Sequence, residues 1–185
     1  VLARHYLASA PSGSYVAAAT AGRSALFLST AVGFIMFPRF AAHDGEGSGA
    51  RRALMISLGL VAALGAAAAA VIALFPHQFL ALLLGTQYGA AEHIVGTLAA
   101  GSAMLGILTI LVYFHLARRT PVAWFPWLGV VASVVAIGVF HDSGIVIARA
   151  EVGSILLLTL VMLVNGVKAT QGESQLALAQ PARPP

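Results

Sequence analysis

Five apolar segments, each about as long as a membrane-crossing helix, constrain this chain more than any other feature. They cover residues 15–37, 53–75, 94–116, 122–140 and 144–167. A helix needs about 20 consecutive, mainly apolar residues to cross the hydrocarbon core of a bilayer. Because these segments occupy most of the 185 residues, they predict an all-α, polytopic membrane helix bundle over residues 11–168.

The composition supports a membrane protein and excludes several kinds of site. Hydrophobic residues make up 59% of the chain and charged residues only 9%, which is too little polar surface to cover a water-soluble domain of this size. The absence of cysteine excludes disulfides, thiolate metal sites and a cysteine nucleophile. No His-x-x-x-His or Glu-x-x-His spacing occurs, so we expect neither a metal site nor a cofactor.

The basic residues indicate the orientation of the bundle. They lie at helix ends rather than on one face, so no nucleic-acid partner is expected. Among the segments that connect or follow the spans, alternate ones contain no Lys or Arg, whereas the others contain these residues, at Arg39, Arg51, Arg52, Arg118, Arg119 and Lys168. By the positive-inside rule, these connections and the C-terminus are predicted to be cytoplasmic. Five spans with a cytoplasmic C-terminus require the first span to start on the outer side. Residues 1–10 are therefore expected to be the outer end of a preceding helix in a longer protein.

The connections have distinct compositions. The Gly-rich segment 41–52 is expected to be a flexible loop. Pro76 precedes about eight mainly apolar residues, too few to cross a bilayer, and we expect a short interfacial helix that ends at Gly85. The tail 169–185 is rich in polar residues, Ala and Pro, and it is predicted to be a disordered cytoplasmic tail.

Small residues recur four positions apart within the spans. The pairs are Gly65 with Ala69, Gly96 with Ala100, Ser102 with Gly106, and Gly129 with Ser133. Such pairs allow helix backbones to approach closely in lipid. They predict a packed bundle, but they do not indicate a function.

Three charged residues inside the spans are the candidate site residues. An ionisable side chain at this depth is costly and normally faces the bundle interior, a partner or a water-filled cavity. Arg23 lies about 12 Å below the outer start of its span at the helical rise, so it is predicted to line a cavity. Arg149 and Glu151 lie near the outer end of the last span and point in nearly opposite directions. Either one of them faces the bundle, or Arg149 extends to the interface and Glu151 makes a structural ion pair.

Several short elements in order resemble one family of membrane transporters. They are the aliphatic stretch Val1 to Leu7, the loop Pro11 to Ser14, the set Gly13, Tyr15 and Ala18, the ending Phe37, Pro38 and Arg39, and the set Gly85, Tyr88, Ala90 and Ala91. Over residues 1 to about 165, the chain resembles the polysaccharide-exporter branch of the multidrug/oligosaccharidyl-lipid/polysaccharide flippase superfamily.

The resemblance implies a protein of about twelve or more helices in two pseudo-symmetric lobes, like other repeat transporters. This chain would supply the end of the seventh helix and the eighth to twelfth, a MATE-like C-terminal lobe whose partner is the missing N-terminal lobe. The implied location is the bacterial plasma (inner) membrane, in the synthesis of lipopolysaccharide or other envelope polysaccharides.

The implied cargo is a polyprenyl-pyrophosphate-linked glycan. Since the guanidinium fork binds phosphate oxygens bidentately, Arg23 is the first candidate contact with the pyrophosphate and Arg149 the second. A cation-coupled multidrug exporter of the same superfamily is the alternative, with Glu151 carrying the coupling ion. A non-transporting membrane scaffold also stays open. A membrane enzyme is not expected, because the loops are too short to hold a sugar donor.

Overall fold

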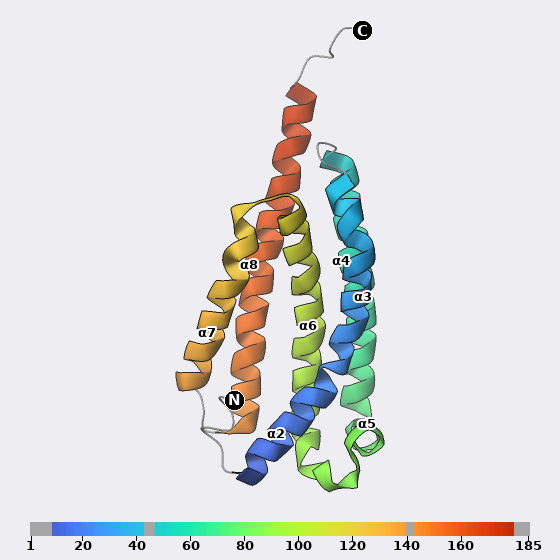
Figure 1. Ribbon diagram of the computed structural model, residues 1–185, viewed down its shortest axis with the longest axis vertical. Coiled ribbons are helices and arrows are strands. Elements are labelled where there is room, and N and C mark those ends of the chain that lie inside the picture. The colour runs from blue at the N-terminus through green and yellow to red at the C-terminus, as the bar shows by residue number, and fades with distance from the viewer. Residues whose placement is uncertain (1–8, 43–46, 140–142, 180–185) are drawn as a thin grey trace.

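A computed structural model describes residues 9–42, 47–139 and 143–179, and these residues form helices without any strand. The elements are α2 (Ser9–Gly22), α3 (Ser24–Ala42), α4 (Gly47–Leu74), α5 (Pro76–Leu84), the 3-10 helix η1 (Thr86–Ala91), α6 (Glu92–Ala117), the 3-10 helix η2 (Pro121–Trp124), α7 (Phe125–Val139) and α8 (Gly144–Ala179). Figure 1 shows the long helices side by side along one axis. The prediction of an all-α helix bundle is therefore confirmed.

Four helical segments are long and apolar enough to cross a membrane. They are Arg51–Leu74, Thr86–Ala117, Pro121–Val139 and Gly144–Lys168, and they coincide with the last four predicted spans. The chain is therefore a membrane protein with transmembrane helices. The first predicted span, 15–37, is divided between α2 and α3.

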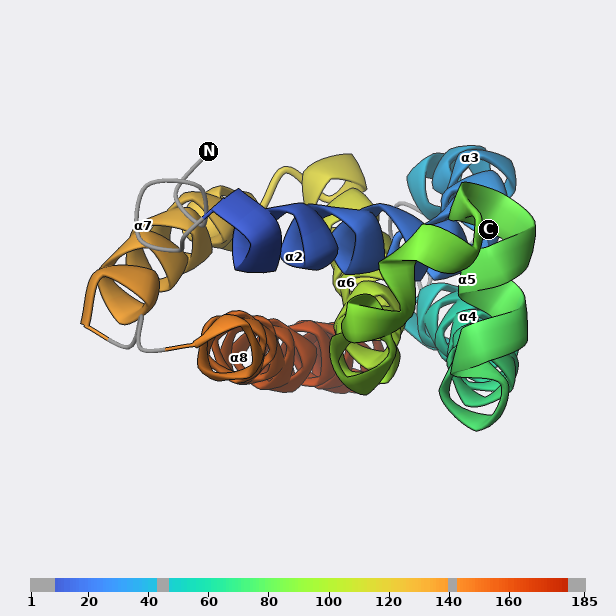
Figure 2. The same cartoon turned by 90° about the horizontal axis from the view of Figure 1, so that it is seen from below.

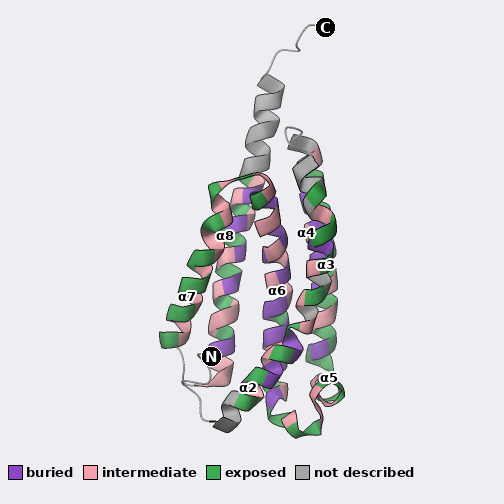
Figure 3. Ribbon diagram, in the orientation of Figure 1, coloured by how far each residue is buried: buried purple, intermediate pink, exposed green. Residues whose placement is uncertain are grey.

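Helix α6 lies at the centre of the bundle. It packs against α2, α3, α4 and α8, and the view along the bundle in Figure 2 shows these helices around it. Its side chains form part of both apolar cores, one near α5 that contains Val95 and one near η2 that contains Leu111 and Phe114. The buried positions in Figure 3 accordingly follow α6 along its length.

The break between α2 and α3 falls at Arg23, and local contacts explain its position. A Cβ added to Gly22 would lie 3.0 Å from the backbone nitrogen of Ala99 and 3.0 Å from the carbonyl carbon of Leu98, so glycine lets α2 approach the backbone of α6. The hydroxyl of Ser24 donates to the carbonyl of Ala21 at 2.7 Å, a side-chain bond that competes with regular helix. The chain then changes direction, and α2 runs obliquely to α3 (Figure 1).

The N-terminal expectations have mixed outcomes. The loop expected at Pro11 to Ser14 is instead part of α2, because a proline in the first turn of a helix costs no hydrogen bond. The outer end of a preceding helix was expected at residues 1–10. Most of that segment, residues 1–8, lies outside the described residues, while α2 already begins at Ser9.

The short helix predicted after Pro76 is present as α5, and it ends at Gly85 as expected. Gly85 has φ of 91°, in the left-handed region that favours glycine. Its N–H donates to the carbonyl of Ala81 at 3.1 Å. In Figures 1 and 2, α5 crosses one end of the bundle nearly perpendicular to its long axis. That direction is compatible with the interfacial position, which stays a prediction.

Two segments are more helical than expected. The Gly-rich segment 41–52 contributes the end of α3 and the start of α4, with residues 43–46 outside the described part of the chain. The tail expected to be disordered over 169–185 instead continues α8 to Ala179. Ala, Gln, Glu and Leu are good helix formers, and the segment from Lys168 to Gln180 contains no proline. Residues 180–185 lie outside the described residues.

The small residues predicted to allow close packing do so between α4 and α6. A Cβ added to Gly65 would lie 3.1 Å from the Cβ of Ala103, and one added to Gly96 would lie 3.3 Å from the Cβ of Ala73. Both distances are shorter than ordinary carbon contacts of about 3.5 to 4.0 Å. The two helices therefore pack backbone to backbone at these positions.

A leucine at Gly65 is expected to destabilise the bundle, because its side chain has to push α4 away from α6. Overpacking of this kind costs about 1 to 3 kcal/mol. The matched control is Gly59→Leu on the same helix, where an added Cβ meets nothing within 4 Å. Unfolding of the purified protein in mixed micelles, followed by circular dichroism, measures both variants. Equal midpoints for Gly65→Leu and Gly59→Leu would contradict this account of the packing.

Candidate functional site

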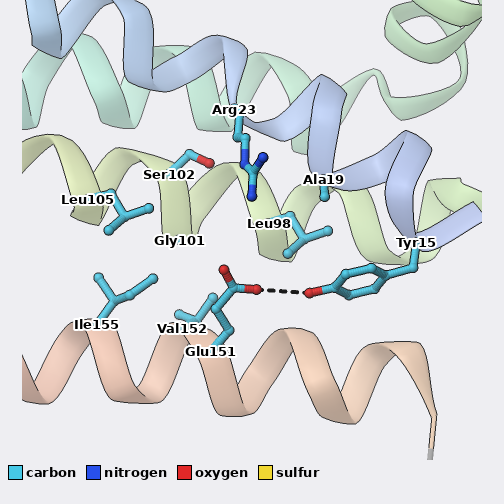
Figure 4. Close-up of a pocket in the computed structure, with 10 residues that line it drawn as sticks. All are labelled: Tyr15, Ala19, Arg23, Leu98, Gly101, Ser102, Leu105, Glu151, Val152 and Ile155. Carbon is cyan, nitrogen blue, oxygen red and sulfur yellow. Dashed lines mark hydrogen bonds between the residues drawn. The ribbon is translucent and has the colours of Figure 1, made fainter. Parts of the chain in front are cut away.

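A small polar cavity lies where α2, α6 and α8 meet, beside the break between α2 and α3. Its volume is about 70 Å³, and Figure 4 shows its lining. The lining residues are Tyr15, Ala19, Arg23, Leu98, Gly101, Ser102, Leu105, Glu151, Val152 and Ile155. Four of them carry polar side chains, at a depth where the surrounding helices are otherwise apolar.

The strongest polar contact in the cavity joins two distant helices. The phenol of Tyr15 on α2 donates a hydrogen bond of 2.8 Å to Oε2 of Glu151 on α8 (Figure 4). Tyr15 is buried, with 8% of its surface exposed. A carboxyl group removed from water needs such a partner to offset its lost hydration. This hydrogen bond therefore engages one oxygen of Glu151 and ties α2 to α8.

Arg23 contributes the positive charge of the cavity. In Figure 4 its guanidinium extends from the α2–α3 junction toward the carboxylate of Glu151 and lies near Ser102. Within the described residues, the one ion pair with N and O closer than 4 Å is His77–Glu92, at 2.8 Å. Arg23 and Glu151 are therefore neighbours across the cavity rather than a closed pair. Arg23 as a whole residue is exposed, so part of it is accessible from outside the bundle.

The floor of the cavity is formed by α6. Ser102 is buried, with 5% of its surface exposed. A Cβ added to Gly101 would lie 2.7 Å from Cγ2 of Val152, so α8 packs directly on α6 at this point. The close packing positions Glu151, one residue earlier on α8, over the cavity.

The structure brings two of the three predicted site residues together. Arg23 and Glu151 line the same cavity, whereas Arg149 is exposed on α8 and is not part of the lining. The predicted divergence of Arg149 and Glu151 is present, and Glu151 is the one that faces the bundle. An ion pair for Glu151, the open structural alternative, is replaced by the hydrogen bond from Tyr15.

Sequence reasoning did not identify Tyr15 and Ser102 as site residues. Ser102 was considered only as a small packing residue, and Tyr15 only as part of the family resemblance. One signal for Tyr15 was available, because Tyr15, Ala19 and Arg23 are spaced by four and share one helical face. No comparable signal exists for Ser102, since its position depends on how α6 packs.

The histidines within the described residues do not form a metal site. No group of three or more His, Cys, Asp or Glu residues in that part of the chain is arranged to hold a metal ion. His115 is fully buried, with Nδ1 2.8 Å from Oγ1 of Thr120 and Nε2 3.2 Å from the carbonyl of Met162. It therefore has a structural role, because it connects α6, the turn that follows it and α8.

Comparison of the chain with models of known protein families, with curated proteins and with solved structures found no match. The resemblance to polysaccharide exporters thus stays a prediction, supported by the motifs quoted for it.

The hydrogen bond between Tyr15 and Glu151 is expected to contribute measurably to stability. Hydrogen bonds between membrane helices are worth about 0.6 to 2 kcal/mol. A double-mutant cycle with Tyr15→Phe and Glu151→Leu isolates this coupling, because each substitution removes one partner of the hydrogen bond with little change in side-chain size. Unfolding of the four proteins in mixed micelles gives the coupling free energy. A coupling within error of zero would show that the bond does not hold α2 against α8.

Proposed function

We propose that this chain is part of a membrane flippase or exporter that moves lipid-linked oligosaccharide or polysaccharide precursors, with Arg23 binding the anionic phosphate head of the cargo. The observation that supports this most directly is the location of Arg23. Its guanidinium lies at a break between two helices and extends into a polar cavity among apolar helices. The resemblance to polysaccharide exporters supports the same class of function.

The cost of a charge inside a membrane supports a binding role for Arg23. Intramembrane charged residues are rare, and they usually mark the pathways of substrates or ions. Transporters commonly bind substrate beside interrupted helices near the bilayer midplane. A guanidinium there suits a phosphate or pyrophosphate, because two parallel N–H bonds match two phosphate oxygens.

In this proposal, the hydrogen bond between Tyr15 and Glu151 leaves the N–H donors of Arg23 open to the cargo. A bare carboxylate beside the guanidinium would compete with an anionic cargo for its N–H donors. The hydrogen bond from Tyr15 engages Oε2 of Glu151, and Arg23 stays outside ion-pair distance within the described residues. This arrangement favours an anion that arrives from the exposed side of Arg23.

The size of the cavity is consistent with a partial site. A volume of about 70 Å³ is well below the ~300 to 1,000 Å³ typical of ligand pockets. It suffices for a phosphate group or a few water molecules but not for a glycan. The proposal therefore needs the first lobe to complete a larger cavity around the sugar. It also places the protein in the bacterial plasma membrane with its C-terminus in the cytoplasm.

A cation-coupled multidrug exporter is the second candidate, and the position of Glu151 favours it. A carboxylate in a polar cavity within the membrane is the group that such coupling requires. Efflux of a cationic dye from vesicles, measured beside flipping of a lipid-linked sugar, separates the two functions. A scaffold would support neither activity while still assembling with its partners.

Arg23→Gln in the complete protein is expected to reduce export strongly. A hydrogen bond to a charged group is worth about 1.5 to 3 kcal/mol, which corresponds to roughly 10-fold to 100-fold in affinity. Arg23→Lys keeps the charge without the fork, so an intermediate loss is expected. The readout is surface polysaccharide at equal membrane abundance, in a host that lacks its own exporter.

The matched control is Arg149→Gln, which removes an arginine that is exposed and outside the cavity. Its export is expected to equal that of the unmodified protein. Unchanged export in Arg23→Gln would refute the binding role of Arg23. Equal losses in Arg23→Gln and Arg149→Gln would indicate a general effect of surface charge instead.

A further inference from the structure

Ser102 differs from the other buried serine and threonine side chains in the part of the chain that the structure describes. Three of these side chains are buried, namely Ser57, Ser102 and Thr159. Ser57 donates to the carbonyl of Ala53 at 2.8 Å. Thr159 donates to the carbonyl of Ile155 at 2.7 Å, so both make the usual bond of a hydroxyl to its own helix. The hydroxyl of Ser102 has no hydrogen-bond partner among the described residues, although only 5% of the residue is exposed.

This hydroxyl faces the polar cavity. Ser102 is part of the lining, and in Figure 4 its oxygen points toward the side chain of Arg23. A buried hydroxyl without a partner is costly, because it has given up its hydrogen bonds to water. Buried polar groups therefore have partners as a rule. A hydroxyl that points away from its own helix and into a cavity indicates that its partner is an occupant of the cavity.

The packing of α6 holds Ser102 in this position. A Cβ added to Gly101 would lie 2.7 Å from Cγ2 of Val152 on α8. On the other side, a Cβ added to Gly65 of α4 would lie 3.1 Å from the Cβ of Ala103. The residues before and after Ser102 are thus packed against two different helices, which fixes the backbone between them. Such preorganisation lowers the entropic cost of binding a ligand.

The contact between α2 and α6 brings Arg23 to the same part of the bundle. A Cβ added to Gly22 would lie 3.0 Å from backbone atoms of Leu98 and Ala99, so Arg23 follows directly after this contact. Ser102 lies three to four residues further along α6, about 5 to 6 Å at the helical rise. Figure 4 accordingly shows the guanidinium and the hydroxyl facing the same space.

The hydrogen-bonding groups indicate the class of ligand. Arg23 has only N–H donors, and Ser102 adds an O–H donor beside them. The hydroxyl of Tyr15 already donates to Glu151. A ligand that accepts from both Arg23 and Ser102 needs several oxygen lone pairs, and negative charge strengthens both bonds. A phosphate group has both properties.

We propose that Ser102 is the second ligand of the phosphate group that Arg23 binds, with its hydroxyl donating to a phosphate oxygen. The inference rests on the proposed function, because it concerns the same site. It adds a neutral donor on α6 to the charged donor at the α2–α3 junction. Water in the cavity would also satisfy the hydroxyl, so the experiment has to distinguish an anion ligand from a water ligand.

Ser102→Ala in the complete protein tests this role, and Ser57→Ala is the matched control. The control is the same substitution at a buried hydroxyl that is bonded to its own helix and lies outside the cavity. The probe is radiolabelled farnesyl pyrophosphate, which has a prenyl tail and a pyrophosphate head. Equilibrium dialysis against the purified protein in detergent micelles measures its binding, and protein-free micelles correct for partitioning of the tail.

We expect Ser102→Ala to weaken binding about 10-fold, because a hydrogen bond to a charged group is lost. Ser57→Ala is expected to bind the probe like the unmodified protein. Thermal unfolding without the probe separates a ligand from a structural hydroxyl. Since the Ser102 hydroxyl has no partner among the described residues, Ser102→Ala is expected to unfold at the same temperature as the unmodified protein or higher. A lower midpoint would assign the hydroxyl a structural role and overturn the inference.

Failure of this inference and failure of the proposed function give different results. If Arg23→Gln weakens binding of the probe and Ser102→Ala does not, the hydroxyl contacts only water. The inference is then wrong, while the binding role of Arg23 stands. If the unmodified protein binds no more probe than protein-free micelles do, both are wrong.

Discussion

Close packing of neighbouring helices against α6 is the constraint on which the rest of this structure depends, and glycine makes each approach possible. Gly22 brings α2 onto the backbone of Leu98 and Ala99, and Gly65 brings α4 onto Ala103. Gly101, on α6 itself, accommodates Val152 of α8. Lipid tails are as apolar as the side chains of the helices, so the hydrophobic effect contributes little to helix association in a bilayer. Close packing contacts of this kind supply much of that association instead. The polar cavity lies between the approaches of α2 and α8.

This packing explains why polar side chains from separate parts of the chain line one cavity. Tyr15 reaches Glu151 because α2 crosses α6 closely enough to face α8, and the two residues are 136 positions apart. The same crossing turns the chain at Arg23. Leu105, Glu151 and Ile155 also line a second, more apolar cleft between α7 and α8. These three residues thus separate two regions that differ in the polar share of their lining.

Much of the fold could be predicted from sequence, because four spans depend only on hydropathy, and the end of α5 depends on a glycine at a left-handed position. The break at Arg23 could not be predicted, because it depends on the tertiary contact of Gly22 with α6. The sequence stays apolar on both sides of the break, so hydropathy gives no sign of it. The helix after Lys168 was missed because polar composition was interpreted as disorder. For the site, helical periodicity predicts that Glu151 and Arg149 point in different directions. The charge of Arg23 within an apolar segment identifies it as a candidate. Ser102 has no such signal, because its role comes from tertiary packing.

The helix break and the charge of Arg23 occur at the same point of the chain. An interrupted helix leaves backbone groups without their regular partners, and such groups are tolerated at membrane depth only beside protein or a water-filled cavity. Here the N–H of Arg23 still donates to Ala19, and the hydroxyl of Ser24 donates to Ala21. The guanidinium of Arg23 faces a cavity that Tyr15, Ser102 and Glu151 line with polar side chains. The break therefore lies beside polar groups rather than in a wholly apolar part of the bundle.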